Sequence, residues 1–91
     1  MTSEREVRIE NRNGLHARPA AEIVKAASKF RSEVTIRRDD MEVNGKSIMG
    51  VMMLAAEYGS TLCVRAQGED AEQAVEALAA LVASRFGERD A

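Results

Sequence analysis

The spacing of apolar residues changes several times along this 91-residue chain, and those changes limit its fold more than any other feature. Alternating apolar and polar residues predict half-buried strands, whereas apolar residues three and four positions apart predict amphipathic helices. Turn-forming Asn, Gly and Asp residues separate the segments. The predicted order is strand, helix, strand, strand, helix, strand, helix, which fits one domain over residues 1–91.

Four of these segments alternate and are predicted to be strands. They are marked by Val7 and Ile9, by Val34 and Ile36, by the short stretch from Met41 to Asn44, and by Leu62, Val64 and Ala66. Each such strand presents one apolar face and one polar face.

Three segments have helical spacing. The first covers about 17–29 and has Pro19 in its first turn, where a missing N–H costs little. The second is capped by Ser47 and reaches about Ala55. The third follows Asp70–Gln73, which resembles a capping box, and reaches about Phe86.

Strands with one apolar face and helices with one apolar stripe are most simply satisfied by a single shared core. The sequence therefore predicts an α+β fold, an open-faced sandwich. In this fold a four-stranded, mainly antiparallel sheet carries all three helices on one face.

Composition narrows the partners and the compartment. The 13 basic and 15 acidic side chains are mixed along the chain and only three residues are aromatic, which argues against a nucleic-acid partner. The longest apolar run, Ile48–Ala56, is too short to cross a bilayer, and the polar start of the chain does not resemble a secretory signal. Cys63 is the only cysteine, so no intrachain disulfide is expected. Together these features predict a cytoplasmic protein without membrane attachment.

The segment Asn13–Ala20 contains the only histidine, His16, between a glycine turn and the start of a predicted helix. Helix N-termini present free N–H groups and the positive end of the macrodipole, which attract phosphate. Arg18 adds a forked cation suited to phosphate oxygens. Both features disfavour an imidazolium, so we expect a neutral, nucleophilic His16 that can accept a phosphoryl group and pass it on.

Other roles for these residue types are open on the residues alone. His16 fits a helix cap or a surface loop residue about as well as a phosphoryl acceptor. A metal site is disfavoured, because one His and one Cys without paired spacing do not make a ligand set. An acid–base pair is disfavoured too, since Asp39-Asp40 and Glu69-Asp70 are adjacent carboxylates in predicted turns.

A second segment, Lys46–Leu54, begins with a capping serine and is apolar nearly all round. Ser47 is either a helix cap only or also a phosphorylation site at a helix N-terminus. The face predicted to enter the core holds Val51, Leu54 and Ala55. The side predicted to stay partly exposed holds Ile48, Met49 and Met52. Such a Met-rich surface is either a patch for several partners or an ordinary apolar overhang.

The two segments together resemble a known family. Gly14–Ala20 is similar to the active-site signature of HPr, the phosphocarrier of the bacterial sugar phosphotransferase system, and Lys46–Met52 resembles the family's regulatory-serine helix. Gly68–Asp70 and the helix after it resemble the family's C-terminal part. The resemblance covers about Val7–Phe86, and the family's fold is the sandwich predicted above.

The resemblance implies a carrier rather than an enzyme, with no cofactor and no metal. His16 would accept a phosphoryl group from Enzyme I on its δ nitrogen, and would donate it to a histidine of an IIA-type domain of a sugar permease. Arg18 would stabilise the phosphoryl group, and Ser47 would correspond to the serine that HPr kinase modifies. The docking surface would contain Ala21, Lys25, Ile48, Met49 and Met52.

Further functions stay open from the sequence. Members of a nitrogen-type regulatory branch share the same motifs, and a binding module controlled at Ser47 would share the serine helix. A small-ligand or metal-binding domain would need a second ligand cluster that the sequence does not contain. Nothing in the sequence requires more than a monomer.

Overall fold

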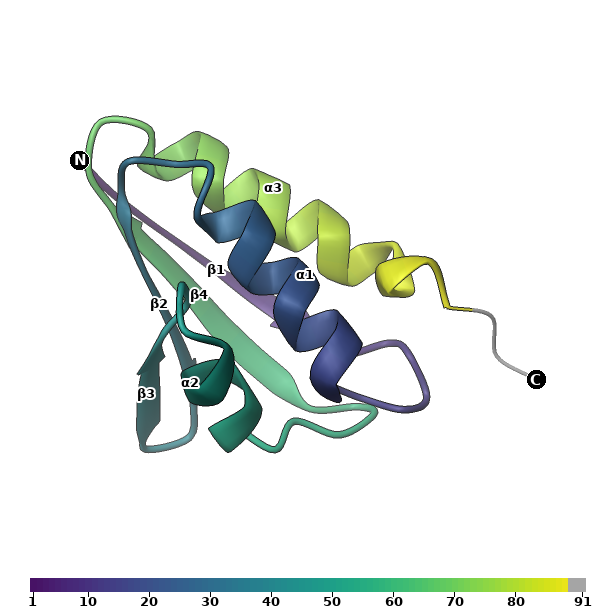
Figure 1. Cartoon of the computed structure of the whole chain (residues 1–91). Coiled ribbons are helices and arrows are strands. Elements are labelled where there is room, and N and C mark those ends of the chain that lie inside the picture. The colour runs from purple at the N-terminus through teal and green to yellow at the C-terminus, as the bar shows by residue number, and fades with distance from the viewer. Residues whose placement is uncertain (89–91) are drawn as a thin grey trace.

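A four-stranded antiparallel sheet with the order β1-β4-β2-β3 forms one layer of the computed structural model, which describes residues 1–88 (Figure 1). The strands are β1 (Thr2–Arg8), β2 (Glu33–Arg38), β3 (Met41–Asn44) and β4 (Thr61–Gln67). All four lie where the alternating residues predicted them. β1 begins earlier than expected because the polar segment before Val7 pairs with β4 from Thr2↔Gln67 onward.

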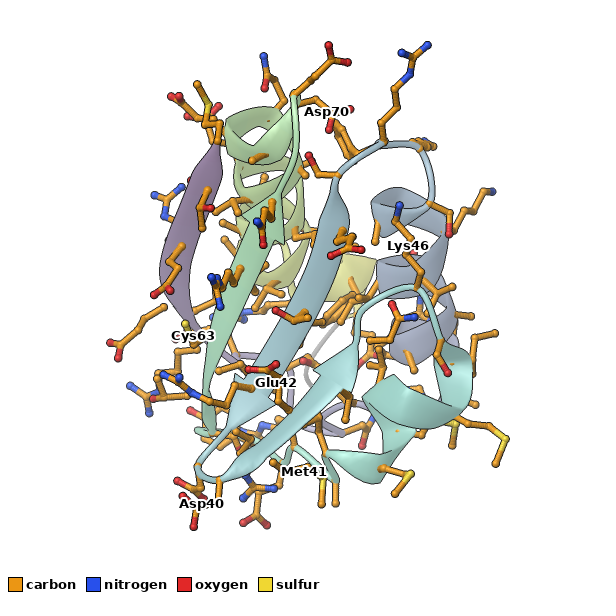
Figure 2. The ribbon with its side chains drawn as sticks, turned by 90° about the vertical axis from the view of Figure 1, so that its left-hand side faces the viewer. Asp40, Met41, Glu42, Lys46, Cys63 and Asp70 are labelled. Atoms are coloured by element: carbon orange, nitrogen blue, oxygen red, sulfur yellow. The ribbon has the colours of Figure 1, made fainter. Side chains whose placement is uncertain are left out.

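The second layer contains α1 (Ala17–Ala27), α2 (Ile48–Met53) and α3 (Ala71–Ala83), followed by a short 3₁₀ turn, Arg85–Gly87. Figure 1 shows α1 and α3 side by side across the sheet, with α2 beyond them near β3. Figure 2 views the molecule from the uncovered side, where Glu42 and Cys63 lie on the sheet and all helices lie behind it. The predicted α+β open-faced sandwich is confirmed.

The core lies between the two layers. The strands contribute their inward residues, and the helices contribute one stripe each. Residues at most 2% exposed include Val34, Ile36, Leu62 and Val64 from the sheet and Ile23, Val51, Val75 and Leu78 from the helices. No helix among residues 1–88 is both long and apolar enough to span a bilayer.

Helix boundaries depart from prediction near the C-terminal ends. α1 ends at Ala27 rather than about residue 29. α3 ends at Ala83 rather than about Phe86, because Arg85 and Phe86 take positive φ angles of 58° and 56°. The prediction that Ala55 belongs to the core is also wrong. Ala55 takes a positive φ of 48° and is exposed, while the buried residue is Ala56, at 3% exposure.

The predicted capping box at the start of α3 is not formed. Asp70 occupies the N-cap position, but its carboxylate makes no cap hydrogen bond to its own helix. Instead it accepts hydrogen bonds from the Ser32 hydroxyl at 2.6 Å and from the backbone N–H groups of Arg31 and Ser32, both at 2.9 Å. The carboxylate therefore ties the loop between α1 and β2 to the start of α3. The Ser32 hydroxyl and the Arg31 N–H hold the pKa of Asp70 down to about 2.

We predict that Asp70→Asn lowers the melting temperature at neutral pH, because the neutral amide accepts these hydrogen bonds less strongly. The folded-state pKa of Asp70 lies below the unfolded value of about 4, so the carboxylate stabilises the fold above that pH and loses the contribution as the pH falls toward 2. Thermal denaturation of both proteins across this range should show their difference shrinking. Glu69→Gln is the control, since Glu69 is 84% exposed. A difference that stays constant down to pH 2 would contradict the assignment.

Candidate functional site

The loop that carries His16 is fixed by backbone contacts with the loop before β4. Ile9 N–H donates to Ser60 O and Leu15 N–H donates to Ala56 O, each at 2.8 Å. Gly14 makes the close approach feasible: its φ is +66°, and a Cβ there would lie 2.5 Å from Ala56 O. Only glycine fits this backbone without strain.

His16 is the N-cap residue of α1, with an extended backbone (φ −80°, ψ −174°) and a ring that makes no cap hydrogen bond. Its side chain is 42% exposed. Within residues 1–88, the backbone N–H groups of Ala17 and Arg18 donate to no other residue, and Pro19 has no N–H. An anion next to the ring would meet two free donors and the positive end of the α1 dipole.

Arg18 lies in the first turn of α1 and is held by acceptors on two sides. Its Nη1 donates to Glu22 Oε2 at 2.8 Å and to Phe86 O at 3.1 Å, and its Nη2 donates to Glu88 Oε2 at 2.9 Å. Half of the side chain is exposed. The guanidinium is thus fixed close to His16 while part of it stays accessible.

Glu88 connects the two predicted site residues. The carboxylate oxygen that accepts from Arg18 also lies 2.7 Å from His16 Nε2, and the other oxygen accepts from Asn11 Nδ2 at 3.1 Å. The Glu88 side chain is only 10% exposed. This burial alone would raise the pKa of Glu88, but the hydrogen bonds from His16, Asn11 and Arg18 outweigh it and lower the pKa.

The Glu88 contact determines the proton position on the His16 ring. An ionised carboxylate only accepts hydrogen bonds, so the proton of the contact belongs to Nε2. In a neutral ring, Nδ1 then carries the lone pair. Nδ1 makes no hydrogen bond to the described part of the chain.

Glu88 and Asn11 were not found by sequence reasoning. Glu88 stands 72 residues after His16 and beyond the last helix, where no periodicity or motif marks it. Asn11 was interpreted only as a turn residue, yet it is fully buried. The fold alone brings the two ends of the chain together here.

Ser47 lies where predicted, as the N-cap of α2, with its hydroxyl accepting from the Gly50 N–H at 3.1 Å. Around it, the predicted docking residues are all exposed on the neighbouring helices α1 and α2. They are Ala21 and Lys25 on α1, and Ile48 (45% exposed), Met49 (77%) and Met52 (43%) on α2. Met53, which was not predicted, is 62% exposed on the same helix.

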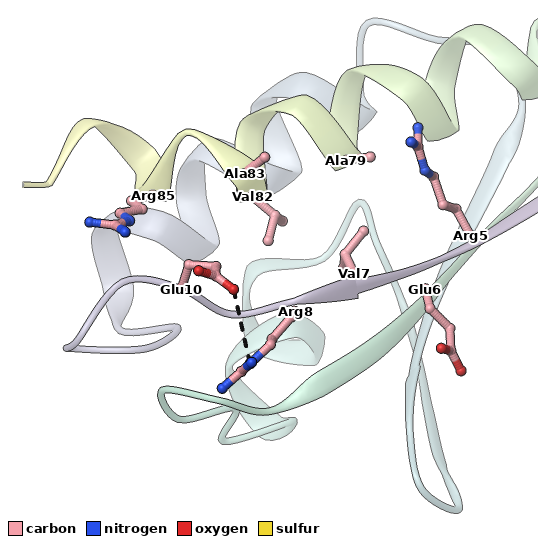
Figure 3. Close-up of a pocket in the computed structure, with 9 residues that line it drawn as sticks. All are labelled: Arg5, Glu6, Val7, Arg8, Glu10, Ala79, Val82, Ala83 and Arg85. Atoms are coloured by element: carbon pink, nitrogen blue, oxygen red, sulfur yellow. Dashed lines mark ion pairs between the residues drawn. The ribbon is translucent and has the colours of Figure 1, made fainter.

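Other candidate sites are weaker. Over residues 1–88 no three His, Cys, Asp or Glu side chains gather closely enough to hold a metal ion. Figure 3 shows an open hollow between the edge of β1 and α3, with Arg5 near one end and Arg85 near the other. The hollow contains none of the His16 cluster, so it adds nothing to the chemistry of that ring.

Comparison with known proteins gives one family. The model described as "PTS HPr component phosphorylation site" matches residues 3–84. The phosphocarrier protein HPr of Cupriavidus necator is 48% identical over 85 residues, covering 93% of this chain and 96% of that protein. A crystal structure of HPr from Thermoanaerobacter tengcongensis superposes with a TM-score of 0.93 at 45% identity, covering 97% and 99% of the chains. The Bacillus subtilis catabolite repression protein Crh, solved as a swapped dimer, gives a TM-score of 0.74 at 46% identity, covering 87% and 91%.

We predict that Gly14→Ala destabilises the fold by more than about 1 kcal/mol and displaces the His16 loop, because both the φ angle and the contact with Ala56 O exclude a side chain. Urea denaturation measures the loss. Gly59→Ala is the matched control: Gly59 also has a positive φ, +87°, but a Cβ there would meet nothing closer than 3.8 Å. Equal losses in the two variants would show that the contact with Ala56 is unimportant.

Proposed function

This chain belongs to the HPr family, the phosphocarrier proteins of the phosphotransferase system, and from that membership we propose that His16 carries the phosphoryl group on Nδ1. HPr is a carrier and not an enzyme in its own right. The observation that carries the proposal is the difference between the two ring nitrogens. Nε2 is engaged by Glu88 at 2.7 Å, whereas Nδ1 makes no hydrogen bond to residues 1–88.

The transfer step needs little beyond this arrangement. The Nδ1 lone pair of His16 attacks the phosphorus of phosphorylated Enzyme I, and the bond from phosphorus to the donor atom breaks with its electron pair staying on the donor. The free N–H groups at the start of α1 and the Arg18 guanidinium neutralise the phosphoryl oxygens. The same step in the opposite sense delivers the group to a histidine of an IIA-type domain of a sugar permease.

Both partners would approach the same surface. The exposed residues of α1 and α2 beside His16 support this role, because methionine side chains adapt to differently shaped partners. The proposed contact residues are Ala21, Lys25, Ile48, Met49 and Met52.

Ser47 is the proposed regulatory site. Its hydroxyl lies at the N-terminus of α2, directly beside the exposed apolar residues, so a phosphate added by an HPr kinase would place negative charge at the docking surface. A second function, that of a regulator controlled at this serine, is favoured by the likeness to Crh. The nitrogen-type branch is the other alternative, since it would use the same His16 chemistry.

The remaining proposals concern location and assembly. We expect one HPr-like domain over residues 1–91, of which 89–91 lie outside the described residues, working in the cytoplasm. We propose a monomer as the working form, because His16 and its described contacts all come from one chain. The swapped dimer of Crh is the alternative assembly.

We predict that His16→Ala abolishes transfer of label from phosphoenolpyruvate and Enzyme I, because the chain contains no other histidine. The label on the wild-type protein should survive base and be lost in acid, as expected for an N–P bond. Circular dichroism should show that the variant folds normally. Unchanged labelling of His16→Ala would exclude this residue as the acceptor.

We predict that Ser47→Asp slows transfer from Enzyme I while leaving stability nearly unchanged, since aspartate is also a good N-cap. Ser47→Ala is the matched control: it should cost about 1 kcal/mol in urea denaturation but leave the transfer rate unchanged. If the two variants transfer at the same rate, Ser47 serves only as a cap.

A further inference from the structure

We propose that Glu88 is a positioning residue for phosphoryl transfer, which fixes the His16 ring through Nε2 and holds Arg18 with the same carboxylate oxygen. This role rests on the proposed carrier function of His16. It concerns a residue outside the segment 3–84 that the family model matches.

The Glu88 carboxylate is itself held in place. Its second oxygen accepts from the side-chain amide of Asn11, which is fully buried. The same amide nitrogen donates to Gly14 O at 2.8 Å, within the turn that precedes His16. Asn11 therefore links the position of Glu88 to the loop that positions the ring.

The backbone before Glu88 is also anchored. Phe86 is 3% exposed in the core, and its carbonyl accepts from Arg18. Two further bonds close the turn, from Gly87 N–H to Ser84 O at 3.1 Å and from Glu88 N–H to Arg85 O at 3.0 Å. Glu88 thus reaches His16 from an ordered turn, so the contact is part of the fold.

The contact contributes to the reaction at two stages. Before transfer, the carboxylate keeps the proton on Nε2 and leaves the Nδ1 lone pair of His16 available. As Nδ1 shares that pair with phosphorus, the ring becomes positive and its charge spreads to the Nε2–H group. A carboxylate 2.7 Å away stabilises this charge without taking the proton.

The position of the carboxylate also avoids a conflict of charge. A phosphoryl group on Nε2 would collide with Glu88, whereas one on Nδ1 occupies the other side of the ring. Arg18 can remain bound to Glu88 through Nη2 and still offer its remaining N–H groups to the phosphoryl oxygens. Glu88 is therefore compatible with transfer at Nδ1 only.

The test compares Glu88→Ala and Glu88→Gln with two controls in the full chain. Glu22→Gln removes a partner of Arg18 that does not contact His16, and Glu76→Gln changes an exposed glutamate of α3 away from the site. Nitrogen NMR of the labelled ring reports which nitrogen carries the proton, without Enzyme I. Single-turnover labelling with phosphoenolpyruvate and catalytic Enzyme I gives the rate of phosphoryl acceptance.

We expect Glu88→Ala to lose the fixed Nε2–H signature and to accept phosphoryl about 10-fold or more slowly, the scale typical for residues that orient a functional histidine. The amide oxygen introduced by Glu88→Gln still accepts from Nε2–H, so the signature should persist with an intermediate rate. Glu22→Gln and Glu76→Gln should leave the ring signals as in wild type.

Two results would overturn the role of Glu88. One is a Glu88→Ala protein with wild-type ring signals and rate. The other is faster acceptance by Glu88→Ala, which would mean that the carboxylate competes with the phosphoryl group for Arg18. A wild-type protein that takes no label contradicts the carrier function itself, and that outcome is distinct because the ring signals are measured without transfer.

Discussion

The sheet has only one apolar face, and most of the site follows from that constraint. All helices must lie on this face, so the start of α1 and the end of α3 both have to lie at the edges of one shared core. The bond from Leu15 N–H to Ala56 O fixes where α1 begins, and buried Phe86 fixes where the chain goes after α3. His16 and Glu88 meet because each directly adjoins one of these two anchors.

The electrostatics of the site combine attraction for an anion with an anion already present. The free N–H groups of α1 and the Arg18 guanidinium attract a phosphoryl group, while Glu88 places a carboxylate in the same cluster. The two requirements are compatible because they apply to different nitrogens of one ring. The carboxylate needs a donor, which is Nε2–H, and the phosphoryl group needs a lone pair, which is on Nδ1.

Local patterns predicted what depends on local physics. The Ser47 cap, the burial of Val51 and Leu54 and the position of every strand follow from the identity of neighbouring residues. The capping box failed because Asp70 found better donors in Ser32 and Arg31, 38 and 39 residues away. The failures at Asp70 and Glu88 have the same origin: a carboxylate binds the best donors that the fold offers, and sequence spacing does not show which these are.

The short helix α2 extends this argument to the proposed docking surface. Six residues are too few for a helix to persist by propensity alone. Ser47 accepts at its start, and Arg38 Nη1 donates to Leu54 O at 2.9 Å and to Ala55 O at 2.7 Å at its end. The exposed methionines therefore project from a helix held by polar contacts at both ends and by Val51 and Leu54 beneath it. A phosphate on Ser47 would act on one of these contacts, so the proposed regulation would alter the support of the docking surface as well as its charge.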